Sequence, residues 1–176
     1  ISPRDWSSDV CSSDLLLAHE RTNIADVNRA KRELERLKRI AKAEGVYDDP
    51  RFRDQIALLE VDVVALEMLV LRVLSAEKSG KQSLDIAGLL KIRGSEIQQR
   101  YTELMMQAAG PFSVPCMLEA MEAGWQGDAA LGGAWPGGAT HCAPLAGTYF
   151  NYRKTTIYGG SNEVQRNIVS QTVLGA

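Results

Sequence analysis

A hydrophobic repeat of three to four residues, sustained over long stretches, is the feature that most constrains the fold of this chain. Between Leu16 and Glu44 there is neither glycine nor proline, and Gly45 follows as a stop. Apolar residues recur in this stretch at Ile24, Val27, Leu34, Leu37 and Ile40. The pattern predicts one long amphipathic helix over 16–44.

The same spacing predicts two further helices. Asp48, Asp49 and Pro50 form a turn that starts the second, because proline suits a first helical position and acidic residues favour a helix N-terminus. This helix is expected to run to about residue 79, with apolar positions at Ile56, Leu59, Val63, Leu66, Val70, Val73 and Leu74. The third is expected from Ser83 to Ala109, with Leu89, Leu90, Ile97, Tyr101, Leu104 and Met105 on its apolar face.

The composition changes over residues 110–148, where glycine, proline and alanine predominate. A short helix is expected near 117–123, and Trp125 and Trp135 are expected to pack rather than stand in a free linker. A last helix is expected over 162–173, and no pair of segments shows convincing strand alternation. The prediction is an all-α fold, an antiparallel bundle of four main helices with a long Gly/Pro-rich loop before the last.

Charge and hydropathy exclude two classes of partner. The formal net charge is -2 and basic residues are interleaved with acidic ones, so no basic field for nucleic acid is expected. The most apolar run, over 61–74, is interrupted by Asp62, Glu67 and Arg72, which indicates an internal helix and not a membrane span.

The cysteines indicate a reducing compartment. Of the three, Cys11 lies near the start, which leaves Cys116 and Cys142, an inventory that suits the cytoplasm better than a disulfide scaffold. With only His19 and His141 beside them, no metal-ligand spacing is found, and no metal site is expected.

The first 15 residues form a separate segment. Asp5 to Leu15 resembles the translation of one reading frame of a common sequencing-library adapter, so 1–15 is interpreted as non-native and 16–176 as the domain. The alternative is a genuine polar N-terminal arm.

The run from Tyr158 to Ile168 contains a glycine pair that leads into the last helix. A Gly-Gly turn lets a phosphate or ring system approach the backbone, and the helix N-terminus behind it offers free N–H donors. Ser161 or Asn162 can cap this helix, and Asn162 with Gln165 is spaced like a capping box. The alternative is an ordinary turn that binds nothing.

The order Thr-Thr-Ile-Tyr-Gly-Gly-Ser-Asn-Glu-Val-Gln-Arg-Asn-Ile-Val, followed by Val173, Leu174 and Gly175, resembles the C-terminal signature of acyl-CoA dehydrogenases. Residues 17–21 with Ile24 and Ala25 are similar to the Glu-Arg motif at the start of that family's C-terminal helical domain, and 91–99 also fits. Residues 143–147 and 150–155 are similar to the pimeloyl-type branch, in which a large and a small subunit pair.

The resemblance implies a flavin-dependent oxidoreductase that removes an α-proton and a β-hydride from an acyl-CoA thioester, with FAD as cofactor. It implies that this chain is inactive without the family's N-terminal and middle domains. The residues it places against FAD are Gly160, Ser161, Asn162 and Glu163, and those beside the acyl chain are Tyr158 and Gly159. The family has a second loop that contacts the cofactor, and in this chain only the run Gln107-Ala108-Ala109-Gly110 resembles it. By this resemblance, Gln107 and Gly110 are expected to contact the cofactor.

The general base is expected at Glu20. Many family members carry the catalytic glutamate directly after the signature tyrosine, but this chain has Gly159 there, and glycine offers no base. Other branches take the glutamate from the Glu-Arg motif, a position that Glu20 occupies. The alternative is that Glu20, in the first turns of a long helix, is a solvated partner of the helix dipole.

The expected partners are the acyl-CoA substrate, an electron-transfer flavoprotein, and further subunits in a homo-oligomer or a large/small hetero-oligomer. Because the long apolar helices would be exposed in a monomer, the chain is expected to associate. Two alternatives stay open: a non-catalytic assembly subunit, suggested by Gly159 and the weakened cofactor loops, and an acyl-CoA oxidase.

Overall fold

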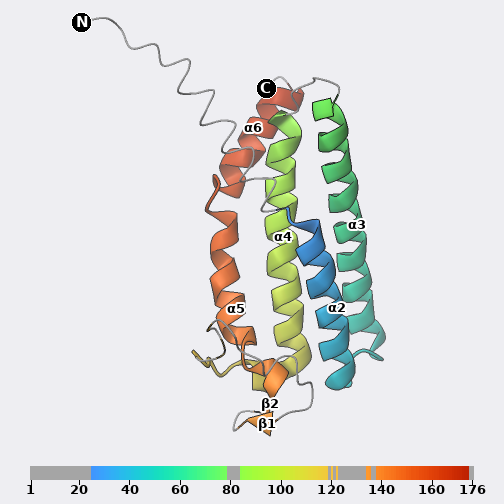
Figure 1. Ribbon diagram of the computed structural model, residues 1–176, viewed down its shortest axis with the longest axis vertical. Coiled ribbons are helices and arrows are strands. Elements are labelled where there is room, and N and C mark those ends of the chain that lie inside the picture. The colour runs from blue at the N-terminus through green and yellow to red at the C-terminus, as the bar shows by residue number, and fades with distance from the viewer. Residues whose placement is uncertain are drawn as a thin grey trace, which may run out of the picture. The chain divides into compact units, whose positions relative to one another are not determined.

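The computed structural model describes residues 25–78, 84–118, 120, 122, 134–135 and 138–174 (Figure 1). The described residues divide into two compact units, one drawn from 25–26, 65–95 and 156–174, the other from 27–64 and 96–155. The helices are α2 (Val27–Ala43), α3 (Pro50–Lys78), α4 (Leu84–Ala109), α5 (Leu145–Tyr152) and α6 (Asn162–Leu174). Short 3-10 turns are η1 (Gly110–Ser113), η3 (Thr140–Cys142) and η4 (Arg153–Thr156), and the strands are β1 (Ala134–Trp135) and β2 (Gly138–Ala139).

In the second unit, α2 and the first half of α3 form a helical hairpin. Gly45 ends α2 with φ 73°, and the Val46 amide donates back to the carbonyl of Ala41 at 3.0 Å. Asp49 caps α3, since its carboxylate accepts from the Arg51 amide at 2.9 Å, which leaves Pro50 at the first helical position. The start of α3 is therefore the one predicted from the turn residues.

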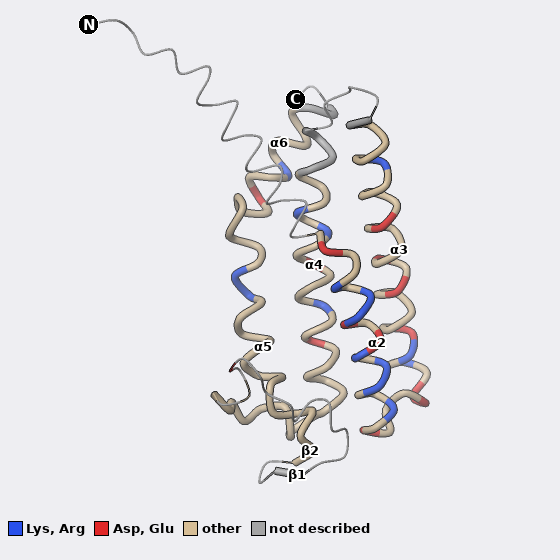
Figure 2. Tube along the Cα trace, viewed as in Figure 1, with Lys and Arg blue, Asp and Glu red and all other residues tan. Residues whose placement is uncertain are grey.

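The core of this unit follows the predicted helical repeat. The buried residues of α2 are Ala30, Leu34, Leu37, Ile40 and Ala41. Lys and Arg recur along α2 (Figure 2), and the Lys38 ammonium bridges Glu35 on its own helix and Glu60 on α3, at 2.9 and 3.3 Å. The hydrophobic face and the charged residues thus take the roles expected of an amphipathic helix.

The second half of α4 packs on α5 in the same unit. The Gln99 amide donates to the carbonyls of Tyr152 and Arg153 at 3.3 and 3.2 Å, and the rings of Tyr101 and Tyr152 meet edge to face with centroids 5.9 Å apart. β1 and β2 pair antiparallel, with Ala134 opposite Ala139.

In the first unit, the second half of α3, the first half of α4 and α6 supply the helices. Leu66 and Val73 of α3 are buried, as are Leu90 and Ile92 of α4. Gly88 of α4 lies against α6, where an added Cβ would stand 3.1 Å from a methyl of Val169. The absent side chain therefore lets these two helices approach closely.

The all-α fold class is confirmed, and the predicted bounds of the second, third and last helices are each within one residue of α3, α4 and α6. α5 adds a helix that the composition of the loop did not indicate. The helix predicted over 16–44 is described only from Val27 to Ala43, because Ala25 and Asp26 are not helical and 16–24 lie outside the described residues. Met117 and Leu118 are not helical either, so the short helix expected near 117–123 does not include them. Residues 119, 121 and 123, Trp125 and the Trp135 side chain lie outside what the structure describes. Within the described part of the chain, the helices all fall short of the length and apolarity that crossing a membrane requires.

Candidate functional site

The diglycine turn before α6 has the backbone that the sequence predicts. Gly159 and Gly160 take φ values of 69° and 88°, the left-handed region that residues with a Cβ rarely adopt. Gly160 is exposed, and Tyr158 beside the turn is 45% exposed. The turn therefore presents backbone with no side chain over it directly before a helix N-terminus.

A buried polar network anchors this turn to α4. The ammonium of Lys91 donates to Oδ1 of Asn162 at 2.6 Å, and Nδ2 of Asn162 donates to the Ser95 hydroxyl at 3.0 Å. Ser95 in turn donates to the carbonyl of Ile92 at 2.8 Å. Lys91, Ser95 and Asn162 are all buried, so these bonds satisfy polar groups that have little access to water.

Gln165 packs under the turn from the next turn of α6. Its side chain is buried, and a Cβ built on Gly160 would collide with its side-chain amide. Within the described residues, no hydrogen-bond donor reaches Oε1 of Gln165. The positive φ therefore favours glycine at position 160, and any side chain there would also have to displace the amide of Gln165.

Ser161 is the residue that caps α6. Its hydroxyl accepts from the Val164 amide at 3.4 Å, and its carbonyl accepts the helical bond from the Gln165 amide at 2.9 Å. Asn162 instead turns its side chain toward α4, so the Asn162–Gln165 capping box predicted as one possibility does not form. The pKa of the exposed Glu163 carboxyl is lowered, first by its own backbone amide and then by the Ser161 hydroxyl, with Arg166 and Lys91 adding weaker attraction.

The arrangement suits an electron-rich ligand. Unprotected glycine backbone, the N-terminus of α6 and the buried cation of Lys91 all offer positive electrostatic potential at one place. The ring system and phosphates of a flavin match such donors, so the residues present fit the cofactor that the resemblance implies. The side chain of Asn162 is already engaged in the network with Lys91 and Ser95, so a ligand at the turn would meet the backbone of Asn162 and not its amide group.

The roles of the other predicted site residues are not tested by the described structure. Gln107 is exposed near the end of α4, and Gly110, with φ 57°, begins η1, both in the unit of 27–64 and 96–155. Glu20 lies outside the described residues. Their roles stay predictions.

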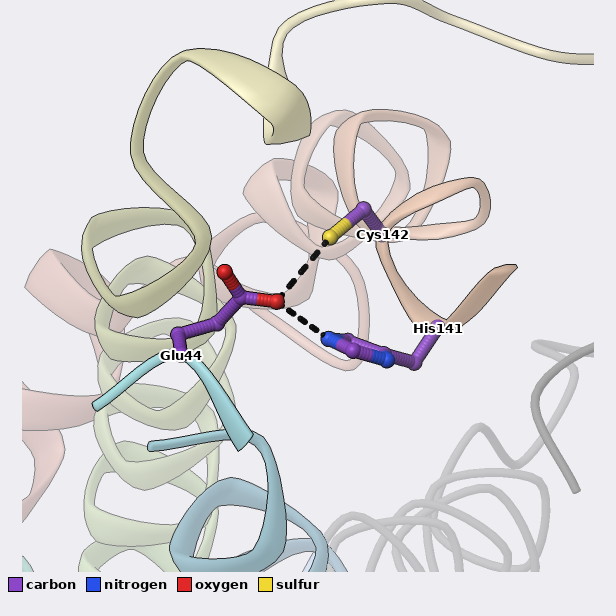
Figure 3. A group of neighbouring side chains, drawn as sticks. All are labelled: Glu44, His141 and Cys142. Carbon is purple, nitrogen blue, oxygen red and sulfur yellow. Dashed lines mark hydrogen bonds and ion pairs between the residues drawn. The ribbon is translucent and has the colours of Figure 1, made fainter. Parts of the chain in front are cut away.

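A second group of chemically active side chains forms where α2 ends, at η3. Oε1 of Glu44 lies 2.6 Å from Nε2 of His141 and 3.8 Å from the sulfur of Cys142, and Figure 3 shows both groups facing the same carboxylate oxygen. His141 and Cys142 are buried. Burial, and then the neighbouring Glu44 carboxylate, raise the pKa of the Cys142 thiol to about 11.

Sequence reasoning missed both groups for identifiable reasons. Lys91 and Ser95 stand one helical turn apart on the same face of α4, a spacing that could have indicated their shared partner. The spacing of cysteines and histidines could not indicate Glu44, because it lies 97 residues from His141 in the chain.

Comparison with known proteins gives one family. Residues 13–174 match the family described as acyl-CoA dehydrogenase, C-terminal domain. A curated relative, acyl-CoA dehydrogenase IpdE1 of Mycolicibacterium smegmatis, is 28% identical over 147 residues, which are 84% of this chain and 31% of that protein. The chain thus spans about a third of the length of this relative.

Solved structures share the fold. The structure of the electron transferring flavoprotein of Acidaminococcus fermentans has a TM-score of 0.68 at 18% identity, covering 93% of this chain and 38% of that one. The Tcur3481-Tcur3483 steroid ACAD gives 0.65 at 22% identity, over 91% and 38%. A glutaryl-coenzyme A dehydrogenase in complex with glutaryl-CoA gives 0.54 at 17% identity, over 90% and 36%.

Proposed function

The chain belongs to the acyl-CoA dehydrogenase family, and on this premise we propose that it is the C-terminal helical part of a flavin-dependent acyl-CoA dehydrogenase. The reaction is the α,β-dehydrogenation of an acyl-CoA thioester. Because the chain matches 31% of its curated relative, we propose that turnover needs the segments of that relative which this chain does not span. Residues 1–15 are proposed to be non-native, and the domain to be 16–176.

The observation that supports this proposal best is the glycine turn held over the Lys91–Asn162–Ser95 network. The exposed backbone at Gly160 and the N-terminus of α6, at Ser161, Asn162 and Glu163, are proposed to hold FAD. A flavin held by these residues would supply the acceptor for the hydride of the β-carbon. The buried network fixes the turn, so its donors need no rearrangement when the cofactor arrives.

The proton from the α-carbon needs a base that this turn does not offer. Gly159 has no side chain, and Glu163, the acidic residue nearest in sequence, is exposed with a lowered pKa that makes it a weak base. We therefore keep Glu20 as the proposed general base. A carboxylate removed from water gains the basicity that this step requires.

The proposed partners follow from the family and from the surface of α3. Apolar side chains stand exposed at helical spacing along this helix: Leu58, Val61, Val64, Met68, Leu71 and Leu74. An exposed apolar stripe of this length favours burial against another subunit. We propose a homo-oligomer or a large/small subunit pair, with an electron-transfer flavoprotein as the electron acceptor.

The proposal is tested on the chain joined to the preceding segments of its own gene. Bound FAD whose visible absorbance bleaches with acyl-CoA under anaerobic conditions supports a dehydrogenase. A complete protein that folds but binds no flavin would refute it and favour the second candidate, a non-catalytic assembly subunit, which the missing carboxylate at Gly159 supports. Oxygen consumption coupled to turnover would indicate an oxidase.

A further inference from the structure

We propose that Glu44, His141 and Cys142 form a binding site for one divalent transition metal ion, with Zn²⁺ as the physiological occupant. The three side chains offer one oxygen, one nitrogen and one sulfur ligand, and these atoms all lie within 4.8 Å of one another. They come from two segments of the same unit, the end of α2 and η3. The site is independent of the flavin chemistry proposed above.

The ligand atoms already converge on one point. The carboxylate oxygen of Glu44 faces Nε2 of His141 at 2.6 Å and the sulfur of Cys142 at 3.8 Å (Figure 3). Tetrahedral zinc with bonds of about 2.0–2.3 Å separates its ligand atoms by roughly 3.3–3.6 Å. The three atoms therefore need shifts of less than about 1 Å to enclose the ion.

The chemistry of the set favours zinc over the hard cations. Thiolate and imidazole bind zinc and its neighbours in the first transition row, whereas calcium and magnesium prefer shells made of oxygen. On binding, the Cys142 thiol would lose its proton to solvent, and Nε2 of His141 would give up the proton that it shares with the Glu44 carboxylate, so that the neutral ring carries its proton on Nδ1. Two anionic ligands and one neutral ligand then balance the dication.

Burial makes the site selective and stable. His141 is 2% exposed and Cys142 is 1% exposed, while the Glu44 side chain, at 19%, leaves a path from solvent. Three protein ligands leave a fourth position for water, as in zinc sites with an open coordination position. Because the ion joins residues 97 positions apart in the chain, its binding stabilises the folded unit.

The test uses the full chain in a background where Cys11 and Cys116 are serine and His19 is glutamine, so that only the proposed ligands remain among cysteine and histidine. The probes are Zn²⁺ alone, by competition with a chromophoric chelator, and Co²⁺ alone, by absorbance. We expect one ion per chain, a thiolate-to-cobalt charge-transfer band, and the visible bands of tetrahedral cobalt. Zn²⁺ should raise the melting temperature, and EDTA should reverse the rise.

Single variants then assign the ligands. Cys142→Ser, His141→Gln and Glu44→Gln should each weaken Zn²⁺ binding at least tenfold. Restoring Cys116, an exposed thiol, should change nothing. Failure of the background protein to bind Zn²⁺, or a cobalt spectrum without the thiolate band, would overturn the proposal and leave an ordinary Glu44–His141 pair. Zn²⁺ binding and the cobalt spectrum are both measured on protein that keeps Glu44, His141 and Cys142. They therefore test the proposal even where a variant of one of these residues does not fold.

Discussion

The ammonium group of Lys91 has no solvent exposure, and it lies 2.6 Å from Oδ1 of Asn162 on another helix. A lysine is rarely buried, because removing its charge from water costs several kcal/mol unless polar partners replace the hydration. The amide of Asn162 supplies such a partner, and it does so at the first residue of α6. The hydrogen bond that satisfies the buried ammonium of Lys91 therefore also holds the start of α6, directly after the glycine turn.

Removal of this acceptor should destabilise the chain. Asn162→Ala is expected to lower the free energy of unfolding by about 2–3 kcal/mol, because the buried charge of Lys91 loses a hydrogen bond that water cannot replace. Asn167→Ala, the same substitution at an exposed position of α6, should cost less than about 0.5 kcal/mol. Denaturant titration measures both, and equal costs for the two variants would contradict the role of the network.

A second prediction concerns Gly160 and its contact with Gln165. Gly160→Ala should cost about 2–4 kcal/mol, since it combines a positive φ with a collision against the Gln165 amide. Gly45 is the matched control, because its φ of 73° is similar but a Cβ there meets nothing within 4 Å. Gly45→Ala should cost only about 1 kcal/mol.

The difference between the costs of Gly160→Ala and Gly45→Ala, in free energy of unfolding, measures the collision alone. Adding Gln165→Ala to Gly160→Ala should recover part of the loss, because the shorter side chain removes the clashing atoms. Thermal or denaturant unfolding gives the coupling between the two sites. Strict additivity of the two substitutions would show that Gln165 does not restrict position 160.

The stability of the chain should fall at alkaline pH through Tyr101. Burial, with Tyr152 close by, raises the pKa of Tyr101 well above its ordinary value of 10.0. Above pH 10 the unfolded chain loses this phenolic proton while the folded chain keeps it, so folding becomes less favourable by up to about 1.4 kcal/mol per pH unit. Tyr101→Phe should remove this part of the pH dependence, as measured by unfolding at pH 9, 10 and 11.

The exposed apolar stripe on α3 should mediate association. Leu58→Glu and Leu71→Glu are each expected to shift the chain toward the monomer, because a charge buried in a subunit interface is strongly unfavourable. Phe150→Glu, at a side chain that is 65% exposed on α5, is the control and should leave the mass unchanged. Light scattering after size exclusion measures the result, and an unchanged oligomer in both α3 variants would exclude this stripe as the interface.

The helical repeat was sufficient to predict most of the fold. Pro50 and the acidic residues before it predicted the start of α3, since their effects on a helix N-terminus are local. α5 could not be predicted in this way. It has eight residues, follows Pro144 and contains Gly147, so its stability depends on burying Leu145 and Ala146 rather than on local preference.

The site was predictable only where it depends on local backbone. The glycine turn and the cap at Ser161 follow from the order of residues at the start of α6. The burial of Lys91 does not, because a lysine on a helix is normally solvated and only the packing of α4 against α6 places it inside. The contact of Glu44 with His141 likewise depends on tertiary packing across most of the chain.

The proposed base and the proposed cofactor site can be tested separately, by substituting Glu20 and Glu163. In the complete protein, Glu20→Gln should abolish turnover while FAD still binds, because an amide of similar shape cannot accept the α-proton. Glu163→Gln, at the N-terminus of α6, should instead change FAD affinity and its reduction potential, because it removes a negative charge beside the proposed flavin contacts. Flavin absorbance measures cofactor content, and anaerobic reduction by acyl-CoA measures the chemical step. A Glu20→Gln protein that reduces its flavin at a near-normal rate would disprove Glu20 as the base and leave the flavin assignment standing, since that assignment depends on the turn at Gly160.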